Sequence, residues 1–146
     1  MARYLVVANE TVTNPLLLEQ LTQITAEDHE AEFTLLVPAT PDQQLLLLRD
    51  SGQESAVVAA LAGKARKMFE MQHINIVDTH VGSGSPAEAI DNEVEAHPGY
   101  AGFVISTFPQ EDSRWLRMGL PKLVQSKYGL PVRYVQAPPD WSGILP

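Results

Sequence analysis

The stretch INIVDTHVGSGSPAEAIDNEVEAH, from Ile74 to His97, decides the fold because it contains one complete strand, turn and helix. Its first part, Ile74 to Val81, alternates apolar and polar residues, which is typical of a strand near the wet edge of a sheet. A helix is predicted from Ser85 to His97, because Ser85 can cap it, Pro86 suits its first turn and Glu88 stands where a capping box needs it. The stretch therefore predicts a strand that leads through a glycine turn into a helix.

The same alternation of strand and helix extends in both directions along the chain. Further strands are predicted at residues 3–8, 31–39, 101–107 and 131–135, and helical patterns at residues 14–29, 41–72 and 112–129. Ser51-Gly52 is expected to break or bend the second of these helices, and Pro121 predicts a break, a kink or a new start in the third. Five strands that alternate with helices favour an α/β fold, a parallel sheet with helices on both faces.

Length, charge and composition narrow the class of protein. The 146 residues fit one domain, which we place at residues 1–136, followed by a proline-rich tail at residues 137–146. The net charge of −8 argues against nucleic acid and against an anionic membrane surface as partners. The absence of cysteine excludes disulfides and thiolate metal sites. No apolar run approaches the roughly 18 residues of a membrane span, and we expect a cytoplasmic protein.

Three segments resemble the universal stress protein family when they are taken in order. They are YLVVANET at the first strand, VGSGSPAEAID with Gly84, Pro86, Ala87 and Ile90, and WLRMGLPKLVQSKYGLPVRYV at the last helix and strand. The resemblance covers nearly the whole chain. It implies a Rossmann-like, five-stranded parallel sheet with the strand order 3-2-1-4-5, and a regulatory or stress-response function.

The phosphate loop of that family departs from its usual pattern in this chain. ATP-binding members carry Gly-x2-Gly-x9-Gly-Ser/Thr, and these four positions fall at Ser106, Pro109, Gly119 and Leu120. Only Gly119 matches, Pro109 has no N–H to donate, and Leu120 is apolar where a hydroxyl belongs. The family usually has Asp near the end of the first strand, where this chain has Asn9. We therefore predict a non-catalytic protein that does not bind ATP by the family's usual mode and needs no cofactor.

The alternative hypothesis is a universal stress protein that binds ATP or AMP through a divergent loop. Parallel sheets bind ligands beyond the carboxyl ends of their strands, where the strand order reverses. Seven residues in the loops at that edge are the candidates: Asn9 and Val37 toward the base, Gly82 and Gly84 toward the ribose, and Ser106, Ser113 and Gly119 toward the phosphates. A hydrolase or transferase on the same sheet is a third hypothesis, for which no set of residues argues.

Two other patterns have a plain structural interpretation that we prefer. Ser113 with Arg114 and Arg117 is read as a capped surface helix with solvated arginines, and an anion site is the alternative. Asp78 and His80 share one face of a strand, which we interpret as a solvated edge rather than as a pair of metal ligands. We predict no metal site and no catalytic set.

The last strand predicts a homodimer. The segment PVRYV is short and apolar, and such a strand at a sheet edge invites pairing unless it is covered. The family resemblance also implies pairing of the last strands across a two-fold axis. Val132, Tyr134 and Val135 are the predicted residues of that dimer edge.

Overall fold

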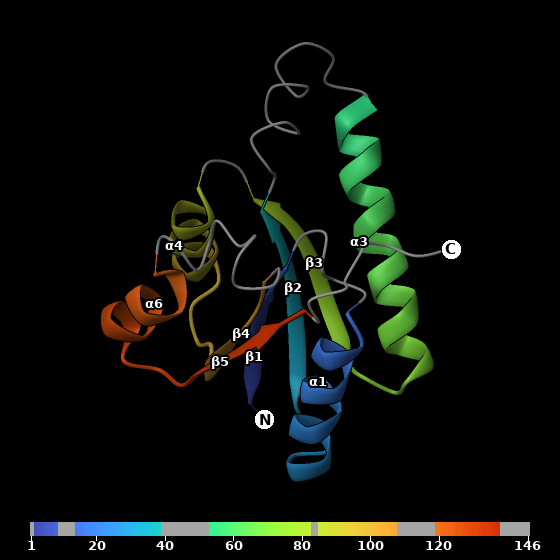
Figure 1. Ribbon diagram of the computed structural model, residues 1–146, viewed down its shortest axis with the longest axis horizontal. Coiled ribbons are helices and arrows are strands. Elements are labelled where there is room, and N and C mark those ends of the chain that lie inside the picture. Colours follow the sequence, from blue (N-terminus) through green and yellow to red (C-terminus); the bar gives the residue numbers. More distant parts are fainter. Residues whose placement is uncertain (1, 9–13, 39–52, 83–84, 108–118, 138–146) are drawn as a thin grey trace.

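The computed structural model describes residues 2–8, 14–38, 53–82, 85–107 and 119–137. They form one parallel sheet whose strands are ordered β3-β2-β1-β4-β5 (Figure 1). The strands are β1 (Arg3–Val7), β2 (Glu32–Pro38), β3 (Ile76–Gly82), β4 (Gly102–Thr107) and β5 (Val132–Gln136). The helices between them are α1 (Pro15–Glu27), α3 (Gln53–Met71), α4 (Pro86–Ala96) and α6 (Leu120–Tyr128). The predicted α/β class, parallel sheet and strand order are confirmed.

The burial of each strand follows from its place in the sheet. The central strands β2 and β4 are almost fully buried, and β1 is buried from Leu5 onward. In edge strand β3 every residue after the buried Ile76 is at least partly exposed, as the sequence predicts for a wet edge. The register between β2 and β3 shifts at Phe33/Thr34, so that Phe33 pairs with Ile76 and Thr34 pairs with Asp78. This irregularity turns Asp78, His80 and Gly82 toward the same face of the sheet as Thr34, whereas Ile76 faces the other side.

Helices α1 and α3 cover one face of the sheet (Figure 1). Leu17, Leu21 and Ile24 recur at helical spacing in α1 and are fully buried against the sheet. Phe69 of α3 and Phe33 of β2 are the largest fully buried side chains in this layer. The apolar face of each helix therefore builds this core, and the first strand contributes alternate residues to it.

Helices α4 and α6 cover the opposite face, where Leu5, Val7, Phe103 and Ile105 meet them (Figure 1). Helix α4 begins with the predicted capping box, in which Ser85 Oγ accepts from the Glu88 N–H and Glu88 Oε2 accepts from the Ser85 N–H. Asp91 of α4 holds α6 through Lys127 Nζ at 2.8 Å and through the Tyr128 hydroxyl, which donates to it.

Several element boundaries differ from those predicted. Strand β3 begins at Ile76 rather than at residue 74, because the Ile74 N–H still bonds to Phe69 O at the end of α3. The last helix begins afresh at Leu120 with Pro121 in its first turn, which selects one of the three alternatives given for Pro121. The predicted break at residues 51–52, the helical pattern at residues 112–118 and the tail from residue 138 lie outside the described residues. Among the helices that are described, none is long and apolar enough to cross a membrane.

Candidate functional site

The carboxyl edge of the sheet holds four of the seven predicted ligand residues. Val37, Gly82 and Ser106 stand at or near the ends of β2, β3 and β4, and Gly119 caps the start of α6. Val37 and Ser106 point to the face of the sheet that α1 and α3 cover. Gly82 packs against α4 and Gly119 precedes α6, and both helices lie on the opposite face. The predicted set is therefore split between two faces of the sheet. Asn9, Gly84 and Ser113 lie outside the described residues.

Gly82 has a packing role that the sequence does not reveal. A Cβ at this position would stand 2.5 Å from Cβ of Ala89 in α4 and 3.4 Å from Cδ1 of Leu36. The glycine therefore lets α4 lie close against β3. This packing contact is sufficient to explain why position 82 is a glycine, without a contact between Gly82 and a ribose.

The start of α6 offers few donors for a phosphate. Gly119 lies in the left-handed region at φ 67°, makes no side-chain cap bond and accepts the N–H of Leu123. Leu120, which stands where the ATP-binding pattern has Ser or Thr, is 1% exposed and packs in the core beneath α6. Pro121 removes one of the N–H groups that a helix start normally presents to an anion. Among the residues that the structure describes here, the backbone N–H groups around Gly119 are what is left for such a ligand.

Buried polar atoms gather at the same carboxyl edge. Thr107 at the end of β4 pairs in register with Gln136 at the end of β5. Within the part of the chain that the structure describes, Thr107 Oγ1 and Gln136 Nε2 have no hydrogen-bond partner, and neither has Asn14 Nδ2 at the cap of α1. Buried polar atoms without partners are costly and uncommon. Within the described residues, these atoms keep hydrogen-bonding capacity for a further partner.

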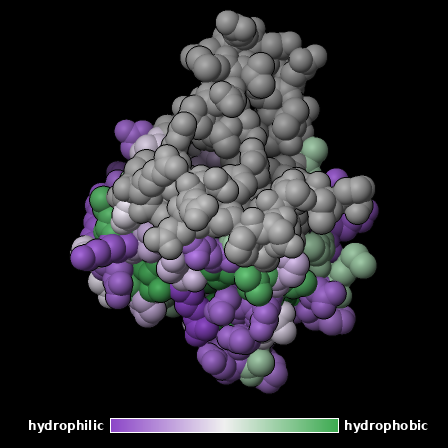
Figure 2. Space-filling view, viewed as in Figure 1, coloured by the Kyte–Doolittle hydropathy of each residue, from purple (hydrophilic) through white to green (hydrophobic). Residues whose placement is uncertain are grey.

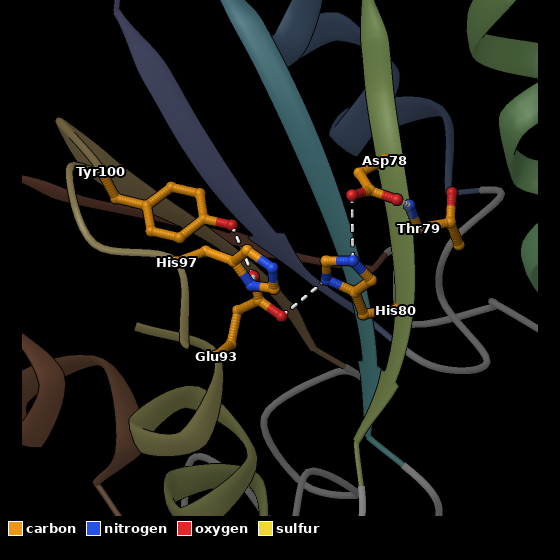
Figure 3. Close-up of polar contacts among 6 residues, drawn as sticks. All are labelled: Asp78, Thr79, His80, Glu93, His97 and Tyr100. Atoms are coloured by element: carbon orange, nitrogen blue, oxygen red, sulfur yellow. Dashed lines mark hydrogen bonds and ion pairs between the residues drawn. The ribbon is translucent and has the colours of Figure 1, made fainter. Parts of the chain in front are cut away.

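A second polar group lies on the flank of the sheet, between β3 and α4. We call His80, Glu93 and His97 the His–Glu–His cluster (Figure 3). His80 Nδ1 lies 2.6 Å from Glu93 Oε1, and His97 Nδ1 lies 3.0 Å from Glu93 Oε2. The two imidazole rings stack with centroids 5.0 Å apart and planes inclined by 18°. One carboxylate is therefore held between two histidines that come from different elements.

Two further residues hold this cluster in place. The Tyr100 hydroxyl donates to Glu93 Oε2 at 2.8 Å, and Asp78 Oδ2 lies 3.0 Å from His80 Nε2 (Figure 3). Burial raises the pKa of Tyr100 to about 12, and its bond to the Glu93 carboxylate adds to that rise, so Tyr100 stays a donor at neutral pH. The Glu93 side chain is only 5% exposed, and a carboxylate so deeply buried needs these partners.

The sequence contains a signal for this cluster that our reasoning missed. Glu93 and His97 are four residues apart in α4, so they lie on one face of the helix. The sequence pattern of β3 alone led to the interpretation of Asp78 and His80 as a solvated edge. In the structure Asp78 is exposed, as that interpretation expects, but His80 also contacts the buried Glu93. The contact arises because α4 follows β3 directly and packs back over its face.

Comparison with known proteins gives a result at the level of structure. No protein-family model matches the sequence, and no curated protein matches it. A universal stress protein family protein from Arabidopsis thaliana, At3g01520, solved with AMP bound, superposes with a TM-score of 0.62 at 12% identity, over 96% of this chain and 94% of that one. Universal stress protein UspA from Lactobacillus plantarum gives 0.52 at 16% identity, over 94% of this chain and 97% of that one. The chain therefore has the fold of the universal stress proteins along almost its entire length.

Proposed function

We propose that this chain is a regulatory or stress-response protein of the universal stress protein type, and that it neither catalyses a reaction nor binds ATP by the family's glycine loop. The similarity of fold over almost the whole chain supports the general class. The stress role rests on analogy of fold, which by itself does not fix a function. We place the protein in the cytoplasm on the same basis.

The burial of Leu120 is the observation that best supports the proposed lack of ATP binding. At 1% exposure this side chain forms part of the core beneath α6, next to Val124. A Ser or Thr hydroxyl at this position would replace an apolar contact of the core. The leucine is therefore required by the packing of α6 on the sheet. Pro121 then removes an N–H from the same turn. The helix start is thus adapted to the core rather than to an anion.

A second candidate function is nucleotide binding through a divergent set of residues. It is favoured by the unpartnered Thr107 Oγ1 and Gln136 Nε2 at the carboxyl edge of the described strands. The Arabidopsis protein of the same fold was solved with AMP bound. AMP has one phosphate, so it makes smaller demands on a glycine loop than ATP does.

Calorimetric titration of the folded protein tests the two candidates together. ATP with magnesium, ADP and AMP would each be titrated at 25 °C, with thermal melts recorded in parallel. We expect no saturable heat with ATP up to millimolar concentration and no shift in melting temperature. Micromolar binding of ATP would overturn the first proposal. Binding of AMP alone would favour the second.

The variant Thr107→Val separates the candidates by a second readout. Valine has nearly the shape of threonine but no hydroxyl, and Thr107 is 2% exposed. If no ligand uses Thr107 Oγ1, removal of an unpartnered buried hydroxyl is expected to stabilise the fold by about 1 kcal/mol. If AMP uses it, the affinity for AMP is expected to fall about tenfold. Thr22→Val is the control, because Thr22 is exposed on α1.

We also propose a homodimer that forms through the open edge of β5. Strand β5 lies at the end of the sheet and pairs with β4 on one side. Tyr134 is 49% exposed, and Figure 2 shows hydrophobic surface among hydrophilic side chains over β5 and its surroundings. Val135 was predicted for the dimer edge, but at 6% exposure its side chain belongs to the core under α1 and α3. Val132 and Tyr134 are therefore the side chains of this proposal.

A further inference from the structure

We propose that the His–Glu–His cluster is a binding site for a divalent transition-metal ion of the zinc class. One ligand atom from each of His80, Glu93 and His97 lies within 4.8 Å of the other two. Imidazole nitrogen and carboxylate oxygen are ligands that Zn²⁺ prefers, and two histidines with one glutamate are a common set for a site with an open position. The site lies between β3 and α4, on the face of the sheet that α4 covers (Figure 3).

The distances between the histidine nitrogens and the Glu93 oxygens are close to those between the ligand atoms of a metal ion. Tetrahedral zinc with bonds of about 2.0–2.1 Å keeps its ligand atoms about 3.3 Å apart. Glu93 Oε1 lies 2.6 Å from His80 Nδ1, and Glu93 Oε2 lies 3.0 Å from His97 Nδ1. Shifts on the order of 1 Å in three side chains would therefore reach the coordination geometry. The strand β3 and the helix α4 that carry these side chains need not move.

The outer partners of the cluster are those that a metal site needs. A histidine that binds a metal through one ring nitrogen usually donates its other N–H to a carboxylate or carbonyl, which fixes the ring. His80 has this arrangement, because Asp78 Oδ2 lies 3.0 Å from Nε2 while Nδ1 points at Glu93. Asp78 is itself oriented, since its Oδ1 accepts from the Thr79 N–H at 3.0 Å. Tyr100 holds Glu93 Oε2 in the same way on the other side.

An adjoining pocket leaves room for the remaining ligands. It has a volume of about 160 Å³ and is lined by His80 and Glu93 together with Leu36, Gly82, Ala89 and Asn92. One water occupies about 30 Å³, so the pocket can hold the water molecules that would complete the coordination of the ion. His97 is about half exposed, which gives the ion a route from solvent.

The competing interpretation is an ion-pair network without metal. A protonated His80 would donate from both nitrogens, to Asp78 and to Glu93, and the contacts would look the same. The two interpretations differ in their response to zinc. An ion-pair network that is not a metal site shows no saturable binding of zinc. A metal site binds one equivalent of zinc and loses affinity when any of its ligand side chains is removed.

Competition titration of the full chain, purified without a histidine tag, tests the proposal. Zinc chloride would be titrated against a chromophoric chelator for the wild type and three variants. We expect one equivalent bound, a loss of at least tenfold in affinity for His97→Gln, and a loss of about tenfold for Asp78→Asn. His29→Gln is the matched control, because His29 is exposed in a turn outside the cluster, and its affinity should stay within twofold.

Cobalt supplies a second readout that depends on geometry. Co²⁺ in the same site should give the intense visible bands of a tetrahedral ion, and His80→Gln should abolish them. Thermal melts would confirm that each variant is folded. No saturable zinc binding by the wild type, or equal affinity of the wild type and folded His97→Gln, would overturn the proposal. An equal loss in His29→Gln would do the same.

Discussion

A methyl group at position 82 would stand 2.5 Å from Cβ of Ala89, too close for any real contact. We therefore expect Gly82→Ala to push α4 away from β3 and to destabilise the protein by about 1–3 kcal/mol. Urea denaturation measures the effect. Gly63→Ala is the matched control, because nothing lies within 4 Å of its added Cβ in α3. That change should stabilise the fold by about 0.5–1 kcal/mol. Equal effects of the two changes would show that the contact with Ala89 is unimportant.

Tyr100 shows how one buried hydroxyl supports a charged neighbour. It is 6% exposed, and its O–H donates to Glu93 Oε2. Tyr100→Phe keeps the ring but leaves the buried carboxylate with one donor fewer, at an expected cost of about 1–3 kcal/mol. Thermal denaturation at pH 7 tests this, with Tyr134→Phe as the control because Tyr134 is half exposed. A neutral result for Tyr100→Phe would mean that Glu93 does not depend on this bond.

At the scale of the element, the start of α4 depends on its capping box. Ser85 Oγ accepts a hydrogen bond from the Glu88 N–H, which is otherwise free at the helix start. We expect Ser85→Ala to lower the free energy of unfolding by about 1 kcal/mol. Ser126→Ala, at an exposed position within α6, should be neutral or slightly stabilising. Chemical denaturation of both variants compares them, and the reverse order of effects would contradict the role of the cap.

The link between α4 and α6 should depend on pH through Asp91. Burial by itself raises the pKa of Asp91, but the hydrogen bonds from Lys127 and Tyr128 outweigh it, so the pKa lies below its ordinary value of 3.8. Because the pKa is lower in the folded chain, the carboxylate stabilises the fold above about pH 4, and this contribution is lost as the pH falls through the folded value.

Asp91→Asn tests this link. The side chain of Asp91 is 39% exposed, so we expect a cost of no more than about 1 kcal/mol at pH 7. The difference from wild type should shrink as the pH falls below 4. Denaturation curves at pH 7 and pH 3 give the comparison, with Glu95→Gln as an exposed control on the same helix. A difference that grows at low pH would contradict the assignment.

At the scale of the whole molecule, the proposed dimer depends on which backbone groups of β5 face outward. The Phe103 N–H donates to Pro131 O, and the Ala137 N–H donates to Thr107 O. In a parallel pair alternate residues bond to the same neighbour, so Arg133 and Val135 face β4, whereas the N–H groups of Val132 and Tyr134 face the open edge.

Tyr134→Pro should therefore block dimer formation without breaking the pairing of β5 with β4. Tyr134→Thr is the matched control, since it removes the ring but keeps the outward N–H. Light scattering is expected to give twice 16.0 kDa for the wild type and 16.0 kDa for the proline variant. A monomeric wild type, or a proline variant that stays dimeric and folded, would contradict pairing through this edge.

The sequence predicted the fold well because each element carries its own local signal. Apolar runs such as residues 3–8 predict central strands, whereas the alternation of apolar and polar residues in β3 predicts an edge strand. Ser85 with Glu88 predicts the start of a helix. These signals depend on neighbours within a few residues. Their regular alternation then leaves few topologies for a parallel sheet.

The candidate sites were only partly predictable, because they depend on which faces meet. The sequence by itself determined that the glycine pattern of ATP-binding universal stress proteins is absent, since Pro109 and Leu120 can be read directly. Only the tertiary structure decided that Gly82 makes room for Ala89 and that Val37 and Gly82 face opposite sides. Only the fold brings His80 to Glu93 across 13 residues, because α4 packs back over β3. A side chain's type is local information, whereas its partners follow from how strands and helices pack.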